Sequence, residues 1–259
     1  TAMETALGMS YAGKRTMVCM KHVGLNVAAD PFINSAVTGA NGGLVVVSAD
    51  DPSMHSSQNE QDSRFFGKFA LLPILEPSNQ QEAYDMVRYA FDLSETFRLP
   101  VLLRITTRLA HSRSGVETKP QRDQNALTLP SNLRQFVLLP AIARKQYKVL
   151  LNQQVALEKE SEGAGFNSYT EGSDNSRGII ATGLAYNYLM ENYPDRKVPY
   201  PVVKIGQYPL PLAMIEKLAD TCAEIVVMEE GMPIVEELLA GLLRRGLKVR
   251  GRLDGTLPR

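Results

Sequence analysis

The 259-residue sequence is poor in the residues that bind soft metals, with only two cysteines and three histidines. Cys19 and Cys222 lie in separate apolar runs without a CxxC spacing, so we expect both to be reduced residues of the core. An iron–sulfur cluster or a zinc site built from the cysteines of this chain is therefore excluded.

Charge of one sign and long apolar runs are also missing. Lys and Arg number 28, as do Asp and Glu, and the absence of a basic stripe argues against nucleic acid as a partner. No apolar run approaches the roughly 18 residues that cross a bilayer, and the start lacks a signal-peptide pattern. Because 44% of the residues are hydrophobic, the chain can bury a real core. We expect a soluble, cytoplasmic protein with no membrane partner.

Common catalytic motifs are absent as well. The sequence has no GxGxxG after a strand, no GxxxxGK[ST] and no GxSxG. Nucleotide binding of the common kinds and serine hydrolysis therefore lose support.

Short apolar runs instead alternate with helical patterns. We predict strands at 15–20, 43–49, 72–77 and 100–106, and a second set at 178–183, 201–206, 224–230 and 247–253. The clearest helix begins at Ser78, with a capping box to Gln81, and ends before Pro100. Further helices are expected at 141–160, 185–193, 212–219 and 234–245. This alternation predicts the α/β class, with mainly parallel sheets whose strands are buried on both faces.

The segment between the two sets is polar and is expected to connect two domains. Its residues 162–176 (EGAGFNSYTEGSDNS) have no apolar period. We expect a first domain at 1–115, a linker with a connecting helix at 116–176, and a second α/β domain at 177–259. The chain opens without Met, already in a helical pattern, and stops after a strand-like run. We therefore expect further sequence on both sides.

All three histidines follow predicted strands of the first domain, namely His22, His55 and His111. Ligands of open α/β sheets bind beyond the carboxyl ends of the strands, so the histidines predict a site at that edge. Polar residues also gather in loops without any function, which is the alternative. Four acids after the second strand could join the histidines in a hard-metal site, namely Asp50, Asp51, Glu60 and Asp62. Since no pair has the short helical spacing of HExxH, we expect no metal site in this chain.

Five segments are distinctive: GMSYAGKRTMVCMKHVGLNVAADP, GGLVVVSADDPSMHSSQNEQDSR, PILEPSNQQEAYDM, LPVLLRITTRLAHSRS and GIIATGLAYNY. They resemble the alpha subunits of the indolepyruvate ferredoxin oxidoreductases, a family of thiamine-diphosphate enzymes. The resemblance covers essentially the whole chain. It implies two three-layer α/β units: a pyrimidine-binding domain whose N-terminal part is missing, and a transketolase C-terminal-like domain.

The resemblance also implies an activity, the oxidative decarboxylation of arylpyruvates such as indolepyruvate to aryl-acetyl-CoA with reduction of ferredoxin. It implies thiamine diphosphate and magnesium, with the magnesium site outside this chain, and 4Fe-4S clusters in the full subunit but none here. Expected partners are the remaining alpha-subunit domains, a smaller gamma or beta subunit, ferredoxin, CoA and the 2-oxo acid, in a homo- or hetero-oligomer. Two alternatives stay open: a noncatalytic assembly module, and a thiamine-diphosphate-dependent decarboxylase without electron transfer.

For the cofactor, KHVGLNVAADP occupies the place of the loop that contacts the pyrimidine ring in the related enzymes. The resemblance thus implies cofactor contacts from the backbone of His22, Val23, Gly24, Leu25 and Asn26. The alternative is a turn before a helix capped near Asn26. The glutamate that activates the pyrimidine is expected just before Thr1, which leaves Glu4 as a helix-surface residue.

For the substrate, many related enzymes carry an arginine at the place of Ala49, and this chain has none there. The resemblance then implies that the following loop holds the substrate carboxylate through His55, Ser56, Ser57, Gln58 and Asn59, with His55 as the catalytic residue. Shorter donors than arginine also leave room for a bulky aryl group. The alternative is a loop whose polar groups pair among themselves or with a partner subunit.

The second domain carries less chemistry. Glu229 and Glu230 precede an amphipathic helix, and we expect them to be solvated or to contact a partner domain. The expected role of this domain is packing and subunit association.

Overall fold

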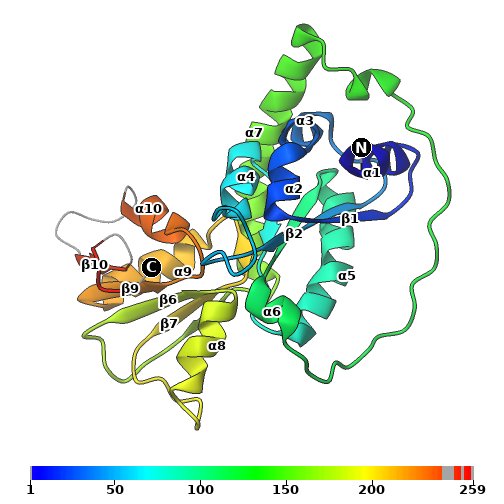
Figure 1. Ribbon diagram of the computed structural model, residues 1–259. Helices are drawn as coiled ribbons and strands as arrows, with labels where there is room; N and C mark the ends of the chain where they lie inside the picture. The colour runs from blue at the N-terminus through cyan, green and yellow to red at the C-terminus, as the bar shows by residue number, and fades with distance from the viewer. Residues whose placement is uncertain (1, 241–247, 252–253, 258–259) are drawn as a thin grey trace.

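The computed structural model describes residues 2–240, 248–251 and 254–257, which form two five-stranded, mostly parallel sheets (Figure 1). The first has the order β1 (Thr16–Lys21), β2 (Leu44–Asp50), β4 (Val101–Thr106), β3 (Ile74–Leu75) and β8 (Gln207–Tyr208). The second has the order β10 (Lys248–Arg250), β9 (Glu224–Met228), β6 (Gly178–Thr182), β7 (Val202–Ile205) and β5 (Ser168–Thr170). Among the strands of the described residues, only β8 and β5 pair antiparallel to their neighbours. The predicted α/β class with mainly parallel sheets is confirmed.

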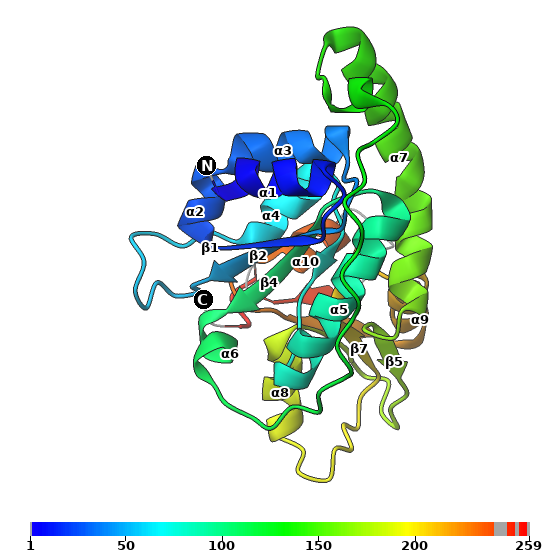
Figure 2. The same ribbon diagram turned by 90° about the vertical axis from the view of Figure 1, so that its right-hand side faces the viewer.

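Helices cover both faces of each sheet. Helices α1 (Ala2–Tyr11), α2 (His22–Val27), α3 (Ala29–Thr38) and α4 (Ser63–Ala70) lie over one face of the first sheet, and α5 (Gln80–Phe97) lies over the other (Figure 2). In the second unit, α8 (Leu184–Glu191) lies on the opposite side of the sheet from α9 (Leu212–Thr221) and α10 (Ile234–Ala240). The short helix α6 (Thr107–His111), the 3-10 helix η1 (Leu133–Phe136) and the long helix α7 (Pro140–Gly163) connect the two units.

The central strands are buried on both faces, as predicted. Along β2, Leu44 and Val46 join the core beneath α1 and α3, whereas Val45 and Val47 pack against α5. Strand β1 is an exception because it is the edge strand of its sheet, and its outward residues Met17 and Cys19 are exposed. The prediction of Cys19 as a core residue was therefore wrong, whereas Cys222 is buried.

The start of α5 differs from the predicted capping box by one residue. Asn79, not Ser78, is the N-cap, and its side chain accepts a hydrogen bond from the backbone N–H of Glu82 at 2.9 Å. The Glu82 carboxylate in turn accepts from the backbone and the hydroxyl of Ser78. Glu82 takes the place assigned to Gln81 because it lies three residues after the true cap. The helix ends at Phe97, before Pro100, as expected.

The polar connection is more structured than predicted. Helix α7 extends beyond the expected range 141–160, and β5, inside the supposed linker, adds an edge strand to the second sheet. The chain then returns to the first sheet through β8, where Tyr208 pairs with Ile74. One apolar core runs through both sheets. The division into domains at 115 and 177 stays a prediction.

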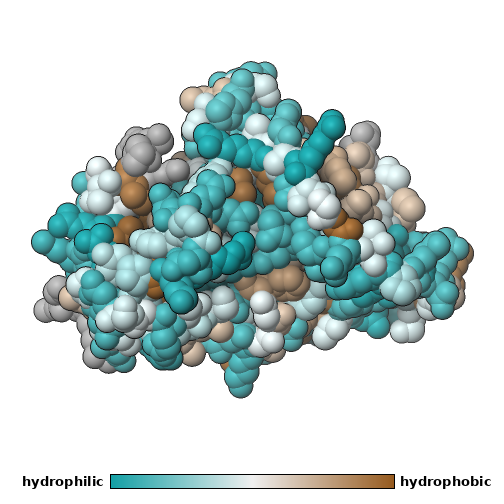
Figure 3. All heavy atoms as spheres, turned by 90° about the horizontal axis from the view of Figure 1, so that it is seen from below, coloured by the Kyte–Doolittle hydropathy of each residue, from teal (hydrophilic) through white to brown (hydrophobic). Residues whose placement is uncertain are grey.

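The predicted strands and helices are present where they can be compared, although β3 is only Ile74–Leu75 and β9 ends at Met228. Of the helix expected at 234–245 and the strand expected at 247–253, residues 241–247, 252 and 253 lie outside the described residues. Seen from below, the surface is mostly hydrophilic with separate small apolar patches (Figure 3). None of the described helices is both long enough and apolar enough to cross a membrane.

Candidate functional site at the carboxyl edge of the first sheet

The carboxyl ends of β1, β2 and β4 lie side by side, because these strands are parallel neighbours. Helix α2 follows β1, the loop 51–62 follows β2, and helix α6 follows β4. Each of these segments carries one of the three histidines, so all three histidines lie at the same edge of the sheet. His22 is the first residue of α2 and His111 the last of α6, whereas His55 lies in the loop. The predicted placement at the edge is confirmed, although two of the three segments are helices and not loops.

Asp51 ties the three strand ends together. Its buried carboxylate accepts hydrogen bonds from the Ser57 hydroxyl at 2.6 Å, the Thr107 hydroxyl at 2.7 Å and the Ser56 backbone at 2.8 Å. Lys21, the last residue of β1, places its ammonium 3.5 Å from the same carboxylate. These hydrogen bonds, with that of Ser57 first, hold the pKa of Asp51 well below its usual range. Asp51 is thus ionised at neutral pH, and its hydrogen bonds fix the loop to its neighbours.

His22 anchors the loop from the other side. Its ring is buried, with Nδ1 3.5 Å from the carbonyl of Ala49 and Nε2 3.3 Å from the carbonyl of Asn59. Both ring nitrogens therefore face backbone acceptors at the two ends of the loop. The ring serves the position of the loop and is not open to a ligand.

The segment predicted to contact the cofactor as a loop is helical. Helix α2 begins at His22, with Lys21 at the N-cap, so neither the expected loop nor a turn is present; a further helix, α3, does follow, but its N-cap is Ala28 and not Asn26. Leu25 is fully buried, Val23 and Gly24 are half-buried, and Asn26 is exposed. Helix α2 follows β1 directly, without an intervening loop, so it begins earlier in the sequence than predicted.

The outer part of the loop is open. His55 and Gln58 are exposed and make no side-chain hydrogen bond or ion pair with the rest of the described chain. The Ser56 and Ser57 groups are occupied, since both bond to Asp51 and the Lys21 ammonium contacts the carbonyl and hydroxyl of Ser56 at 3.0 and 3.1 Å. The loop therefore pairs internally on its inner side and presents His55 and Gln58 on its outer side.

The turn that carries His55 is strained. Ser53 and Met54 have φ values of 67° and 55°, in the left-handed region that side chains other than glycine rarely adopt. Hydrogen bonds from the backbone N–H of Met54 to the Asp51 carbonyl and of Ser53 to the Glu60 carboxylate hold this turn. Such strain, maintained by surrounding bonds, is a feature of functional sites.

A buried charge network lies under the edge and was missed from the sequence. It consists of Asp50, Asp62, Arg64, Glu76, Arg104, Tyr208 and Glu229. Arg104, in the middle of β4, contacts Asp50 at 2.7 Å and Asp62 at 3.4 Å, and also pairs with Glu76. The signal was available, because an arginine inside the apolar run PVLLRIT needs buried partners.

Arg64 extends the network to the second unit. Its guanidinium pairs with Asp62 at 2.5 Å and with Glu229 at 2.9 Å, and it donates to the carbonyls of Glu230 and Met232. The backbone comes close here only because position 231 is glycine. A Cβ at Gly231, where φ is 93°, would lie 2.7 Å from Asp62 and 2.8 Å from Arg104. The network thus joins the first sheet to the turn between β9 and α10.

Burial and the two arginines act in opposite directions on the carboxyl groups of Asp62 and Glu229. Burial raises the pKa of Asp62, but Arg104 and Arg64 outweigh it and lower the pKa to about 2. Burial dominates for Glu229 and raises its pKa. Glu229 is buried and also accepts from the backbone of Val235 and Glu236 at the start of α10. The prediction that Glu229 is solvated or faces a partner domain was wrong, because it pairs inside this chain.

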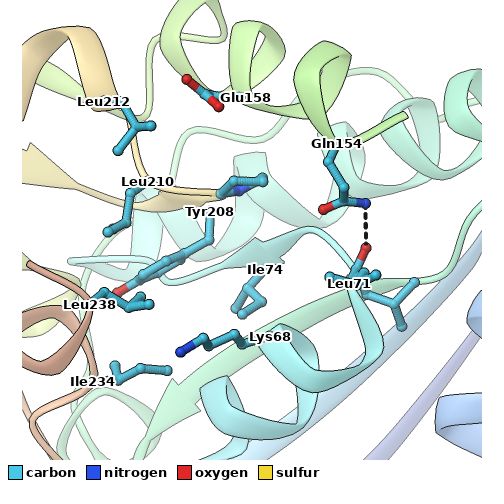
Figure 4. Close-up of a pocket in the computed structure, with 12 residues that line it drawn as sticks. Lys68, Leu71, Ile74, Gln154, Glu158, Tyr208, Leu210, Leu212, Ile234 and Leu238 are labelled. Carbon is cyan, nitrogen blue, oxygen red and sulfur yellow. Dashed lines mark hydrogen bonds between the residues drawn. The ribbon is translucent and has the colours of Figure 1, made fainter. Parts of the chain in front are cut away.

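An apolar cavity of about 240 Å³ lies between the two units (Figure 4). Its walls come from α4, β3, α7, β8, α9 and α10. They include Ile74, Leu210, Leu212, Ile234 and Leu238, with Lys68 and Glu158 as charged residues. The ring of Tyr208 forms part of the wall, while its hydroxyl donates to Glu76 of the charge network at 2.9 Å. None of the predicted site residues lines this cavity.

Metal ligands do not gather in the described part of the chain, where no group of three or more His, Cys, Asp or Glu side chains could hold an ion. The acids considered for a hard-metal site instead have other partners. Asp50 and Asp62 pair with arginines, and Asp51 binds hydroxyl and backbone donors. Glu4 is exposed on α1, as expected.

Comparison with known proteins gives relatives along the whole chain. Indolepyruvate oxidoreductase subunit IorA of Methanothermobacter thermautotrophicus is 41% identical over 263 residues, which cover 99% of this chain and 43% of that protein. The subunit of the same name from Archaeoglobus fulgidus is 44% identical over 261 residues, covering 99% of this chain and 41% of that protein. The chain thus spans less than half the length of these curated relatives.

A solved structure supports the fold. The 2-oxoglutarate:ferredoxin oxidoreductase from Magnetococcus marinus, with 2-oxoglutarate, coenzyme A and succinyl-CoA bound, superposes with a TM-score of 0.72 at 14% identity, covering 96% of this chain and 52% of that chain. The family model described as pyruvate flavodoxin/ferredoxin oxidoreductase, thiamine diphosphate-binding, matches residues 1–167. The predicted resemblance is confirmed: this chain belongs to the thiamine-diphosphate-binding family of the pyruvate flavodoxin/ferredoxin oxidoreductases.

Proposed function

We propose that this chain is part of a cytoplasmic oxidoreductase that oxidatively decarboxylates arylpyruvates, indolepyruvate among them, to aryl-acetyl-CoA with reduction of ferredoxin. The observation that carries the proposal is the identity of 41% and 44% with two indolepyruvate oxidoreductase subunits over 99% of the chain. The rest of the alpha subunit and a smaller gamma or beta subunit complete the enzyme.

Thiamine diphosphate would supply the electron sink for decarboxylation. Helix α2 would form one side of the pyrimidine site. It packs closely on β1 at Gly24, where a Cβ would lie 3.1 Å from the Cβ of Met20, and Val27 at its end is 87% exposed. The backbone of His22–Asn26 would form this wall, and a facing domain would form the other.

Magnesium and the 4Fe-4S clusters would be bound elsewhere in the proposed enzyme. The described residues offer no cluster of metal ligands, so magnesium and the diphosphate it binds would be held by another domain. Two cysteines are too few for a 4Fe-4S cluster, which needs four thiolates. The clusters that pass electrons to ferredoxin would therefore lie in the remainder of the full subunit.

The substrate carboxylate would be held at the outer side of the loop 51–62. His55 and Gln58 are exposed there with free donors, while Ser56 and Ser57 shape the loop through Asp51 and lie within reach of the same space. Lys21 adds a positive charge beside Ser56. Sequence reasoning missed this lysine, although a lysine that ends an apolar strand at the carboxyl edge is a recognisable signal.

The test is a substrate comparison with the full-length subunit assembled with its smaller partner subunit. We expect CoA-dependent reduction of ferredoxin, with kcat/KM for indolepyruvate at least about tenfold above the values for pyruvate and 2-oxoglutarate. Release of an aldehyde without ferredoxin reduction would instead identify a decarboxylase. A fully assembled complex that turns over no 2-oxo acid would identify a noncatalytic assembly module.

A further inference from the structure

The apolar cavity between the two units lies apart from the residues proposed to contact cofactor or substrate (Figure 4). Its volume is about 240 Å³, and leucine and isoleucine side chains form most of its wall, namely Ile74, Leu210, Leu212, Ile234 and Leu238. A cavity of roughly 150 Å³ with walls of this kind holds benzene, because water finds few hydrogen-bond partners there. The larger cavity of this chain therefore has room for a two-ring aromatic group.

The polar groups of the wall are already occupied, which leaves aromatic and aliphatic surface for a ligand. The Tyr208 hydroxyl donates to Glu76 at 2.9 Å, so Tyr208 offers its ring to the cavity. The Gln154 amide donates to the carbonyl of Leu71 at 3.1 Å (Figure 4). Aromatic rings pair favourably with one another beyond the area that they bury. The tyrosine ring thus favours an aromatic ligand over an aliphatic one.

Lys68 gives the cavity a positive charge. It is exposed and also lines the cavity, so the cavity reaches the surface at this residue. Figure 4 shows its side chain lying from α4 toward Ile234 and Leu238. Its ammonium makes no hydrogen bond or ion pair with the described residues. An ammonium beside apolar walls pairs well with a carboxylate, because both hydrogen bonding and charge favour the contact.

Glu158 makes the two ends of the cavity electrically different. Its side chain comes from α7, on the other side of the cavity from Lys68 (Figure 4), and it too has no partner among the described residues. A ligand carboxylate is attracted by Lys68 and repelled by Glu158. The charges of the wall therefore direct a carboxylate to the side of α4.

We propose that this cavity binds a small carboxylate that carries a two-ring aromatic group, with the ring against Tyr208 and the leucines and the carboxylate on the Lys68 ammonium. The walls come from both units, so the ligand binds only when the two units are packed together and stabilises that packing. The inference does not depend on the proposed function, because none of the residues proposed to contact cofactor or substrate lines the cavity.

Indole-3-acetate is a suitable probe, since the chain contains no Trp and indole fluorescence reports on the ligand alone. Titration with the 259-residue chain should saturate with a dissociation constant on the order of 100 µM. Indole-3-acetamide has the same shape without the charge and should bind at least about fivefold more weakly. Absence of saturation up to about 2 mM would overturn the proposal.

Two further probes test the ligand class. Tryptamine carries an ammonium in place of the carboxylate, and octanoate carries a carboxylate without a ring. Both should bind more weakly than indole-3-acetate. Tighter binding of tryptamine would assign recognition to Glu158 instead of Lys68, and tighter binding of octanoate would rule out the aromatic class.

Lys68→Met tests the carboxylate contact, because methionine keeps an apolar stem and removes the charge. This variant should bind indole-3-acetate and indole-3-acetamide equally, with the amide within twofold of its affinity for the parent. Lys148→Met is the matched control. Lys148 is exposed on α7 and does not line the cavity, so the same change of charge should leave both affinities unaltered. Equal effects of the two variants would show general attraction of anions and contradict the site.

Leu212→Phe tests the location of the ligand. Leu212 lines the cavity and is only partly buried, so a larger side chain can occupy the space without displacing the core. Indole-3-acetate at ten times its dissociation constant should raise the thermal unfolding midpoint of the parent by roughly 2–5 °C. The midpoint of a Leu212→Phe variant that is folded by circular dichroism should not move. An equal rise in both proteins would place the ligand elsewhere and overturn the assignment.

Discussion

His22 and His55 lie at the same edge of the first sheet but have opposite surroundings. His22 is buried with both ring nitrogens directed at backbone carbonyls, whereas His55 is exposed on a strained turn. A side chain without partners in the described protein is available to a ligand, and one with all its partners in place is not. At the scale of single residues, His55 is therefore the one of these two histidines whose ring is open to a ligand.

His55→Ala in the complete enzyme should lower kcat/KM for indolepyruvate by about one to two decades, because it removes a hydrogen-bond donor to the substrate carboxylate. Thiamine diphosphate affinity should stay close to that of the parent. Glu60→Gln is the control, since glutamine keeps an acceptor for the backbone of Ser53. Steady-state kinetics that place His55→Ala within twofold of the parent would show that the loop does not hold the carboxylate.

At the scale of elements, side-chain caps set the starts of α4 and α5. Asn79 binds the N–H of Glu82 at the start of α5, and Asp62 binds the N–H of Arg64 at the start of α4. Both residues follow extended backbone and precede the first turn. The Asp62 cap also lies beside Arg64, which pairs with Glu229 of the second unit. The residue that starts α4 therefore also takes part in the contact between the two units.

Asn79→Ala should destabilise the protein by about 1 kcal/mol, because the N–H of Glu82 loses its acceptor. Asn79→Ser, which keeps a side-chain oxygen at the cap, should recover most of this loss. Urea unfolding followed by circular dichroism measures both variants. Equal stability of the alanine variant and the parent would mean that the cap contributes nothing to α5.

At the scale of the whole molecule, the buried charge network and the shared apolar core hold the two sheets together. The network reaches from β2 and β4 of the first sheet to the turn after β9 of the second. Removing one member of a buried charge network leaves its partners unpaired and away from water, which strongly lowers the stability of the folded protein.

Arg104→Met should therefore cost about 3–5 kcal/mol of unfolding free energy, since Asp50, Glu76 and Asp62 all lose a partner. Arg122→Met is the control. Arg122 pairs with Asp92 at 2.6 Å with both side chains partly exposed, so its loss should cost less than about 1 kcal/mol. Thermal and urea unfolding measure both variants. Equal losses of unfolding free energy in Arg104→Met and Arg122→Met would contradict the view that the buried network holds the two sheets together.

The 259-residue chain alone should show no turnover and only weak thiamine diphosphate binding. Its two cysteines cannot ligate a 4Fe-4S cluster, and its described residues present no metal cluster for a diphosphate-bound magnesium ion. Titration calorimetry with thiamine diphosphate and magnesium measures the affinity. A dissociation constant in the micromolar range for this chain alone would contradict the expectation that another domain supplies half of the site.

The sequence by itself determined the class of the fold, the positions of most strands and the family. Apolar runs such as that of β2 are short and rich in β-branched residues, and these properties belong to the chain itself before it folds. The edge that carries the histidines also followed from the sequence, since strand order in a parallel sheet places all carboxyl ends together.

Only the tertiary structure decided which polar residues are buried and which are open. Arg104 and Glu229 are 125 residues apart in the sequence, and no local pattern shows that they belong to one network. Strand β8 has two residues and joins the sheet of a distant segment, so its pairing rests on long-range hydrogen bonds alone. Burial and charge pairing depend on neighbours in space, and those neighbours exist only after the chain has folded.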